Sequence, residues 1–245
     1  MSDAAGVRRL GMLTPSSNTV LEPVTGAMLA GLPNVTAHFA RFRVTEISLG
    51  QGALRQFETG PMLAAAELLA DARVAGICWN GTSAGWLGFE SDARLCVAIS
   101  ERTGIPACSS VLALNEIFQR TGVRRFGLVT PYLPEIQQAI VANYAAAGFE
   151  CVAERHLLDR DNFAFSEYGE GVIAALCREV APARPDAITI FCTNLRGAPV
   201  VASLEEELGI PIYDTVATAV WKSLALTGVA PKRVQGWGRL FADLG

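Results

Sequence analysis

Residues 188–197 read Ile188-Thr-Ile-Phe-Cys192-Thr-Asn-Leu-Arg-Gly197. An apolar, β-branched run ends on a cysteine, and polar residues and a glycine follow it. This order is typical of the carboxyl end of a buried parallel strand, where α/β sheets bind their ligands. A similar stretch upstream reads Ile77-Cys-Trp-Asn-Gly81-Thr-Ser-Ala-Gly85, and it has Gly81 where the later stretch has Cys192.

The two stretches belong to a larger internal repeat. Arg8–Pro15 and Arg124–Pro131 are both short apolar strand patterns that end in Thr-Pro. Gly104-Ile-Pro106 returns as Gly209-Ile-Pro211, and each is a helix stop before a new strand. Strand and helix patterns alternate between these points, which predicts two copies of one βαβα unit.

The predicted fold class is therefore α/β, with two pseudo-symmetric parallel-sheet lobes and the active site in the cleft between them. We expect an N-terminal lobe over residues 1–118 and a C-terminal lobe over 119–217, because about 100 residues suffice for such a unit. The C-terminal segment 218–245 is expected to pack back on the first lobe. The cleft would be lined by four strand-end loops: Thr14–Thr19, Asn80–Gly85, Thr130–Tyr132 and Cys192–Gly197.

The composition excludes several classes of function. The chain is 51% hydrophobic and 18% charged, so it can build a large core and is not a disordered chain. Its net charge is -4, and it has no basic tract that would bind nucleic acid. It has no apolar run long enough to cross a membrane, and no apolar signal core at its N-terminus. These features predict a cytoplasmic protein that binds neither nucleic acid nor membrane.

The cysteines give no sign of metal binding or of disulfides. None of the six forms a CxxC pair, and no Cys-His spacing suits a metal, so we expect no metal site. The Gly11-Met-Leu-Thr-Pro15 turn does not fit a dinucleotide fingerprint, which argues against a nucleotide cofactor. Most of the thiols are interpreted as small buried hydrophobes, and no chemical role is expected for Cys78, Cys96, Cys108, Cys151 and Cys177.

Cys192 is the candidate reactive group. The two histidines, His38 and His156, lie in strand patterns away from the predicted loops, so a Ser-His-Asp arrangement is not supported. A thiol at a strand end can act as acid, base or nucleophile when nearby N–H groups tune its pKa. The alternative is that Cys192 is a buried structural thiol.

The predicted cleft carries neutral hydrogen-bond donors rather than charges. Such groups suit a carboxylate or a developing enediolate, whose charge is spread over oxygens. The same residue types also cap helices and stabilise turns, so each has a structural alternative. Arg196 could hold a second carboxylate or lie exposed at a helix start. The donors are Ser17, Asn18, Thr82, Ser83, Tyr132, Thr193 and Asn194.

These motifs resemble the aspartate/glutamate racemase superfamily over nearly the whole chain, and within it arylmalonate decarboxylase and maleate cis-trans isomerase. Pro15-Ser-Ser-Asn-Thr19 is similar to the carboxylate-binding loop of the isomerases. Gly81-Thr-Ser83 resembles the corresponding loop of the decarboxylase, and Thr130-Pro-Tyr132 resembles the tyrosine-bearing loop of both enzymes. Asp161-Asn162 looks like the asparagine segment of the isomerases, and Gly236-Trp-Gly-Arg-Leu-Phe241 is similar to the decarboxylase C-terminus.

The resemblance implies one-cysteine chemistry. Racemases and isomerases of this type use a cysteine in each lobe, whereas this chain has Gly81 at the first position and Cys192 at the second, as the decarboxylase does. It departs from the decarboxylase after the cysteine, where Thr193 and Asn194 replace glycines. The resemblance implies a cofactor-independent decarboxylase of a malonate-like acid, in which Cys192 protonates an enediolate.

Two alternatives stay open: a maleate isomerase or racemase of small dicarboxylates or amino acids, and a non-catalytic carboxylate-binding protein. In each case the partner is a small carboxylate, and a homo-oligomer is compatible with the sequence. The implied substrate-binding residues are Pro15, Ser17, Asn18, Thr82, Ser83, Tyr132, Asn162, Thr193 and Asn194.

Overall fold

Two four-stranded parallel sheets form the centre of the molecule, as seen in a computed structural model that describes residues 6–245. Their strand orders, β2-β1-β3-β4 and β6-β5-β7-β8, are the same order repeated, which confirms the predicted α/β fold with two matching sheets. The strands are β1 (Arg8–Pro15), β2 (Val35–Phe42), β3 (Gly76–Trp79), β4 (Ala107–Ser109), β5 (Arg125–Thr130), β6 (Glu150–His156), β7 (Ala187–Ile190) and β8 (Ile212–Asp214).

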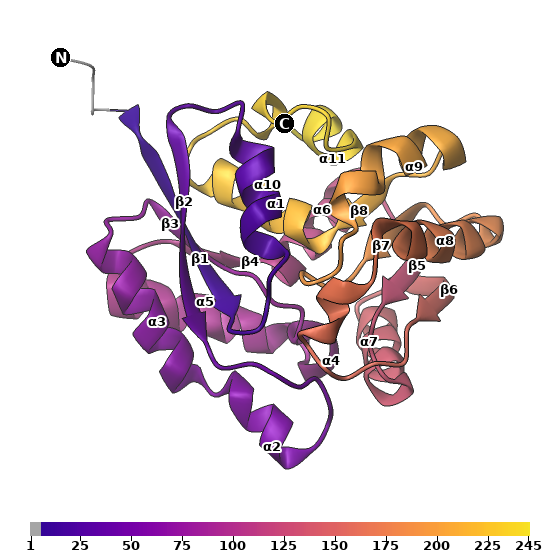
Figure 1. Cartoon of the computed structure of the whole chain (residues 1–245), viewed down its shortest axis with the longest axis horizontal. Coiled ribbons are helices and arrows are strands. Elements are labelled where there is room, and N and C mark those ends of the chain that lie inside the picture. Colours follow the sequence, from indigo (N-terminus) through magenta and orange to yellow (C-terminus); the bar gives the residue numbers. More distant parts are fainter. Residues whose placement is uncertain (1–5) are drawn as a thin grey trace.

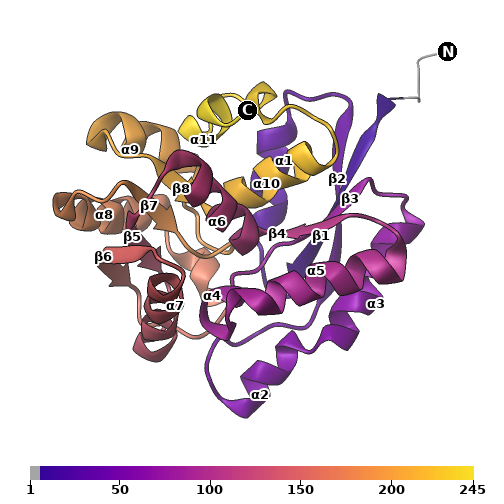
Figure 2. The same cartoon turned by 180° about the vertical axis from the view of Figure 1, so that it is seen from behind.

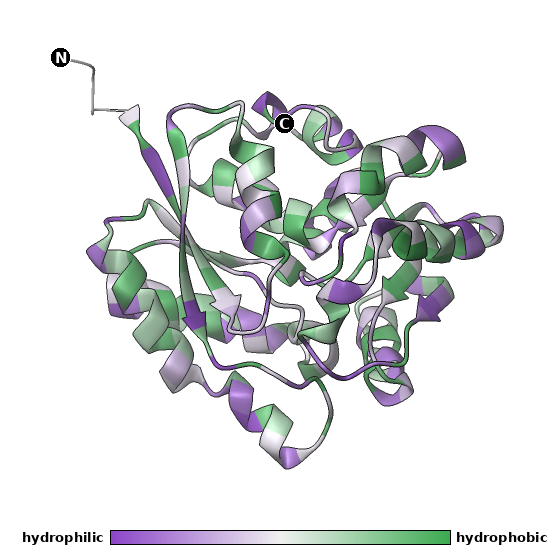
Figure 3. Cartoon of the chain, in the orientation of Figure 1, coloured by the Kyte–Doolittle hydropathy of each residue, from purple (hydrophilic) through white to green (hydrophobic). Residues whose placement is uncertain are grey.

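Helices surround the two sheets, which Figures 1 and 2 show from opposite sides. Figure 3 shows hydrophobic residues along the central strands, which agrees with their burial between helices. The helices are α1 (Leu21–Leu29), α2 (Gln51–Leu54), α3 (Thr59–Asp71), α4 (Ala84–Leu87), α5 (Phe89–Thr103), α6 (Ser110–Thr121), α7 (Pro134–Ala146), α8 (Glu170–Val180), α9 (Val201–Leu208), α10 (Thr215–Leu226) and α11 (Arg239–Asp243).

The inner strands follow directly from the sequence. Every residue of β3 and of β7 is buried, which agrees with their continuous apolar pattern. The helices before β4 and β8 end at Gly104 and Gly209, whose φ angles of 70° and 69° place them in the left-handed region. Glycine adopts this conformation without a steric cost, so the Gly-Ile-Pro stops work as predicted.

The helix that follows the last strand of each sheet crosses to the other sheet. Phe118 of α6 packs against Phe126 of β5 and Tyr213 of β8, with ring centroids 5.5 and 6.1 Å apart. In return, α10 lies against α1, β3 and β4 of the first sheet. The two helices also pack on each other, and Thr218 donates to the carbonyl of Ser110. The lobe boundary at residue 118 stays a prediction.

Two short helices lie in connections between larger elements. α2 and the 3-10 turn Arg55–Phe57 lie between β2 and α3, and α4 begins inside the predicted loop Asn80–Gly85. Helices of about one turn are too short to show a 3.6-residue hydrophobic period. Both lie next to the candidate site described below.

The crossed packing of α6 can be tested by truncating its central side chain. Phe118 is fully buried, so Phe118→Ala is expected to lower the free energy of unfolding by about 3–5 kcal/mol. Leu68→Ala on α3 is the control: Leu68 is 66% exposed, and its loss should change stability by less than about 0.5 kcal/mol. Denaturant unfolding measures both, and equal small effects would contradict this account of the packing.

Candidate active site

The carboxyl ends of β1, β3, β5 and β7 meet, and their loops enclose one small pocket. None of its thirteen lining residues is charged. It combines neutral polar groups with an apolar wall, so it would hold an anion by hydrogen bonds rather than by ion pairs. The lining residues are Pro15, Val44, Ile47, Phe57, Trp79, Gly81, Thr82, Ser83, Trp86, Tyr132, Asn162, Cys192 and Thr193.

Cys192 follows β7 and lines this pocket, although it is almost fully buried. Its Sγ accepts a hydrogen bond from the backbone N–H of Asn194 at 3.4 Å. Burial raises the pKa of the Cys192 thiol from 9.0 to about 12, although the Tyr132 hydroxyl and the N–H of Asn194 act in the opposite direction. The side chain is therefore a thiol at neutral pH, and it can give a proton but is a weak nucleophile.

A buried acid helps to keep this thiol protonated. Asp214 ends β8, and its Oδ1 accepts from the N–H groups of Val216 and Ala217 at the start of α10. Burial raises the pKa of Asp214 to about 7, and its negative charge raises the pKa of Cys192. Asp214 therefore both caps helix α10 and raises the pKa of the candidate proton donor.

Tyr132 and Thr82 form a pair of hydroxyl groups beside Cys192. Their oxygen atoms are 2.6 Å apart, and both side chains are buried. Burial raises the pKa of Tyr132 well above 10, so its hydroxyl remains a neutral donor. The rings of Trp86 and Phe165 pack edge-on against Tyr132 and fix its position. Thr82 comes from the first sheet and Tyr132 from the second, so the pair forms only when the two units are joined.

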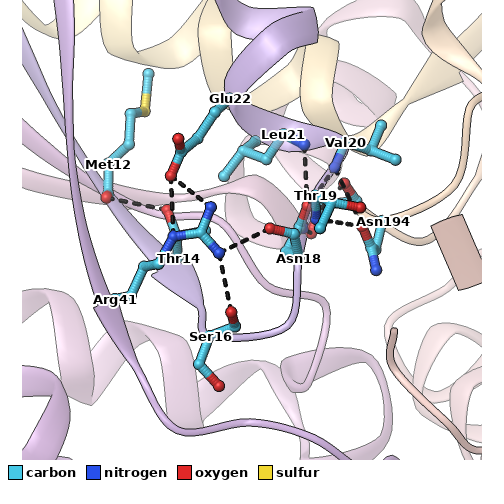
Figure 4. A network of polar contacts seen from close by, with 11 residues as sticks. Met12, Thr14, Ser16, Asn18, Thr19, Val20, Leu21, Glu22, Arg41 and Asn194 are labelled. Carbon is cyan, nitrogen blue, oxygen red and sulfur yellow. Dashed lines mark hydrogen bonds and ion pairs between the residues drawn. The ribbon is translucent and has the colours of Figure 1, made fainter. Parts of the chain in front are cut away.

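The Asn18 amide joins the loop after β1 to the loop after β7. Its Nδ2 donates to the carbonyl and hydroxyl oxygens of Thr193, both at 3.1 Å. Its Oδ1 accepts from the N–H groups of Val20 and Leu21 and so caps α1. In return, Asn194 Oδ1 accepts from Thr19 and Val20 (Figure 4). The two asparagines thus fasten the strand ends of one sheet to those of the other.

Two further residues, Arg41 and Asn162, hold the same loops. Arg41 on β2 donates to the carbonyls of Ser16 and Asn18 and pairs with Glu22 at 2.6 Å, as Figure 4 also shows. Asn162 donates to the hydroxyl of Ser17 at 2.7 Å and accepts at its carbonyl from the side chain of Asn194. These polar contacts leave the loops little freedom to rearrange.

The predicted site residues divide into two groups. Pro15, Gly81, Thr82, Ser83, Tyr132, Asn162, Cys192 and Thr193 line the pocket. Ser17, Asn18 and Asn194 lie beside it and hold its loops together. Neither histidine lines it: His38 contacts Thr36, and His156 contacts Glu154. Arg196 is exposed and donates to the carbonyl of Ser166.

The sequence did not point to the apolar wall of the pocket. Val44 and Ile47 follow β2, Phe57 ends the 3-10 turn, and Trp86 lies on α4. With these side chains in place the cavity measures only about 20 Å³, which is room for about one water molecule. A carboxylic acid can therefore enter only if part of this wall moves. The sequence offered one signal for this wall: the segment between β2 and α3 contains several glycines and carries isolated apolar residues.

Among residues 6–245, no group of three or more histidine, cysteine or acidic side chains is arranged to hold a metal ion. All six cysteines are free. No helix in the described part of the chain is long and apolar enough to cross a lipid bilayer.

Comparison with known proteins places the chain in a family. A family model described as arylmalonate decarboxylase matches residues 18–241. The chain belongs to the arylmalonate decarboxylase family. Its curated relatives include a maleate isomerase of Nocardia farcinica, 30% identical over 243 residues and 96% of each chain. They also include the arylmalonate decarboxylase of Bordetella bronchiseptica, which is 27% identical over 158 residues, or 64% of this chain and 66% of that protein.

Solved structures of this family share the whole fold. A cysteine-to-serine mutant of the Nocardia farcinica maleate cis-trans isomerase, with a covalently bound succinylcysteine intermediate, has a TM-score of 0.88 and 26% identity. That match covers 97% of this chain and 99% of the isomerase. A liganded double mutant of arylmalonate decarboxylase has a TM-score of 0.86 at 24% identity, over 97% of this chain and all of the other.

The space beside Gly81 is occupied by the ring of Trp79. A Cβ atom on Gly81 would lie 2.0 Å from Cζ2 and 2.4 Å from Cη2 of Trp79, which is far inside van der Waals contact. The Trp79 indole is itself held by the ring of Phe42, 5.2 Å away between centroids. The position predicted to have lost the first cysteine is thus filled by a neighbouring ring, and any side chain there would displace Trp79.

This close approach predicts that the stability cost of a side chain at position 81 depends on the residue at position 79. Gly81→Ala is expected to lower the free energy of unfolding by about 1–3 kcal/mol, because overpacking forces Trp79 to move. In a Trp79→Leu background the same change should cost much less, and a double-mutant cycle by denaturant unfolding measures that coupling.

Gly26→Ala provides the control for this cycle. A Cβ at Gly26 meets nothing within 4 Å, and in the middle of helix α1 alanine should stabilise by about 0.5–1 kcal/mol. Equal costs of Gly81→Ala in both backgrounds would show that Trp79 does not restrict this position.

Proposed function

We propose that this family member is a cofactor-independent decarboxylase of a malonate-like carboxylic acid. The observation that carries the proposal is the single thiol in the pocket: Cys192 lines it, and the ring of Trp79 fills the space where a second cysteine would stand. One proton donor suffices to protonate a carbanion after loss of CO2, whereas racemisation needs an acid and a base on opposite faces.

The first step breaks the bond between the α-carbon and one carboxylate. The electron pair of that bond passes into the remaining carboxylate, which becomes an enediolate, and neutral CO2 leaves. Thr82, Ser83 and Tyr132 would donate hydrogen bonds to the enediolate oxygens, whose charge grows in the transition state. The apolar side chains Ile47 and Trp86 would surround the departing carboxylate, where water cannot compensate its charge.

The second step is protonation of the carbon by Cys192. Its S–H proton forms the new C–H bond, the product leaves as a monocarboxylate, and the thiolate then recovers a proton from solvent. The raised pKa of Cys192 supports this role, because the group that must give a proton carries one throughout the neutral range. We assign Asn18 a positioning role rather than contact with the enediolate, because its amide donates to Thr193.

Maleate isomerisation is the second candidate function, because a maleate isomerase is 30% identical over nearly the whole chain. The covalently bound succinylcysteine in the Nocardia farcinica isomerase shows a cysteine attached to substrate-derived carbon in that protein. Attack by Cys192 on maleate would need its thiolate, which burial disfavours. The decarboxylase therefore fits this site better.

Cys192→Ala tests the proton donor. The wild type is expected to release CO2 from a substituted malonate, and Cys192→Ala to lower kcat by about 10²–10⁴-fold, which is typical for loss of a general acid. Cys151→Ala is the control, because Cys151 lies on β6 and does not line the pocket. Full activity of Cys192→Ala would refute the assigned role.

The same assays separate the alternatives. Conversion of maleate to fumarate without CO2 release from any malonate would favour the isomerase. Hydrogen exchange at an amino acid α-carbon would favour a racemase. Carboxylate binding with no turnover by the wild type would indicate a binding protein.

The pKa of Cys192 predicts the alkaline side of the pH profile. A donor with a pKa of about 12 stays protonated at lower pH, so kcat/KM for decarboxylation should not fall between about pH 7 and 10 through loss of this proton. Rates measured across this range check the expectation, with protein stability followed in parallel. A loss of activity near pH 8 in protein that remains folded would mean that Cys192 ionises far more easily than its burial implies.

A further inference from the structure

A second, larger cavity adjoins the candidate active site. It measures about 360 Å³ and lies between α3, α5 and the end of β3. The two cavities share Phe57, Trp79 and Ser83 as lining residues. Apolar and polar residues contribute equally to the rest of its wall, with Arg94 exposed at its edge. The remaining lining residues are Thr59, Met62, Leu87, Ser91, Asp92, Leu95 and Ala98.

Asp92 is a buried acid in this wall. It lies in the first turn of α5 and is only 2% exposed. Its Oδ2 atom has no hydrogen-bond partner among the described residues. Burial raises the pKa of Asp92 to about 7, and the nearby Ser109 hydroxyl and Trp79 indole act in the opposite direction. The mechanism above makes no use of this acid.

The indole N–H of Trp79 is a second buried atom without a hydrogen-bond partner in the described chain. Asp92 Oδ2 is an acceptor when ionised, and Trp79 Nε1 is a donor. Both residues line the same cavity. Because an unpaired buried polar atom costs about 1–3 kcal/mol, a group that satisfies both atoms would be held well. A hydroxyl group can donate to one and accept from the other.

The volumes point in the same direction. The pocket around Cys192 measures about 20 Å³ and cannot hold more than a small polar group without movement of its wall. The adjoining cavity of about 360 Å³ falls within the range of pockets for small ligands. The adjoining cavity offers room for the rest of a substrate that places its carboxylates near Cys192.

We propose that the cavity beside Asp92 is a distal subsite, which selects carboxylic acids with an apolar tail that ends in a hydroxyl group. The hydroxyl donates to Asp92 and accepts from the indole of Trp79, while the tail packs on Met62, Leu95 and Phe57. The assignment rests on the proposed function for the position of the carboxylates. It adds the substrate class, which the residues around Cys192 do not define.

Binding of unreactive acids tests the subsite separately from decarboxylation. Dissociation constants are measured by calorimetry for a homologous series of ω-hydroxyalkanoates and for the matching alkanoates. At the tail length that reaches Asp92, the hydroxy acid is expected to bind the wild type about tenfold more tightly than its partner. These monocarboxylates have no second carboxylate to lose, so the result does not depend on turnover.

Three variants identify the source of the preference. Asp92→Leu replaces the carboxyl group with an apolar side chain, and should reduce the preference for the hydroxy acid to about twofold or less. Trp79→Phe removes the indole N–H but keeps a ring, and should reduce it in part. Glu90→Gln is the control, because Glu90 is exposed on the same helix and does not line the cavity. Because each variant is judged by a ratio of two ligands, a general loss of stability does not mimic the effect.

The outcomes are distinguishable. No hydroxyl preference at any tail length, or one that persists unchanged in Asp92→Leu, overturns the subsite. If malonates are not decarboxylated but the preference is present and lost in Asp92→Leu, the subsite stands and the proposed reaction falls. If malonates are decarboxylated at equal rates with and without a terminal hydroxyl, the reaction stands and the subsite falls.

Discussion

The reciprocal contacts of Asn18 and Asn194 hold the candidate site together. Each amide belongs to a loop at the carboxyl end of a different sheet, and each bonds to the backbone of the other loop. Buried amide networks of this kind are costly unless every member is satisfied, so they fix one arrangement of the loops. Cys192 lies in the same loop as Asn194, and Thr193 of that loop also donates to the carbonyl of Asn80, which ties it to the loop that carries Thr82. The Thr82 hydroxyl in turn contacts that of Tyr132, at the end of β5.

The electrostatics of the pocket follow from its burial. A positively charged lining would favour the thiolate of Cys192, whereas this uncharged and enclosed lining favours the neutral thiol. The nearby Asp214 acts in the same sense. Because of its raised pKa, Cys192 carries a proton at neutral pH, which suits protonation of a carbanion better than attack on the double bond of maleate. Trp79 leaves the pocket with one reactive side chain, because its ring lies where a second one, at position 81, would need room.

The repeated strand ends made much of the fold predictable. The apolar run that ends at Cys192 and its counterpart at Gly81 indicated two parallel sheets and the loops that line the pocket. Periodicity could not reveal the one-turn helices α2 and α4, nor that Phe57 would reach the pocket from a connection. It also could not distinguish a residue that lines the pocket, such as Thr82, from one that holds its loops, such as Asn18. That distinction depends on which partners each side chain meets across the two sheets, and these partners are far apart in the sequence.

The crossing of α6 and α10 makes each half of the chain depend on the other. A polypeptide with a single copy of the repeat would leave its last helix without a sheet to cover, and the aromatic face around Phe118 would be exposed to water. Two such copies could each place that helix on the other, as in a domain-swapped homodimer. In this chain the internal repeat supplies both sheets, so each crossing helix is covered without a second subunit. Because the two halves belong to one chain, equivalent positions can carry different residues, as Gly81 and Cys192 do, which two identical subunits could not achieve.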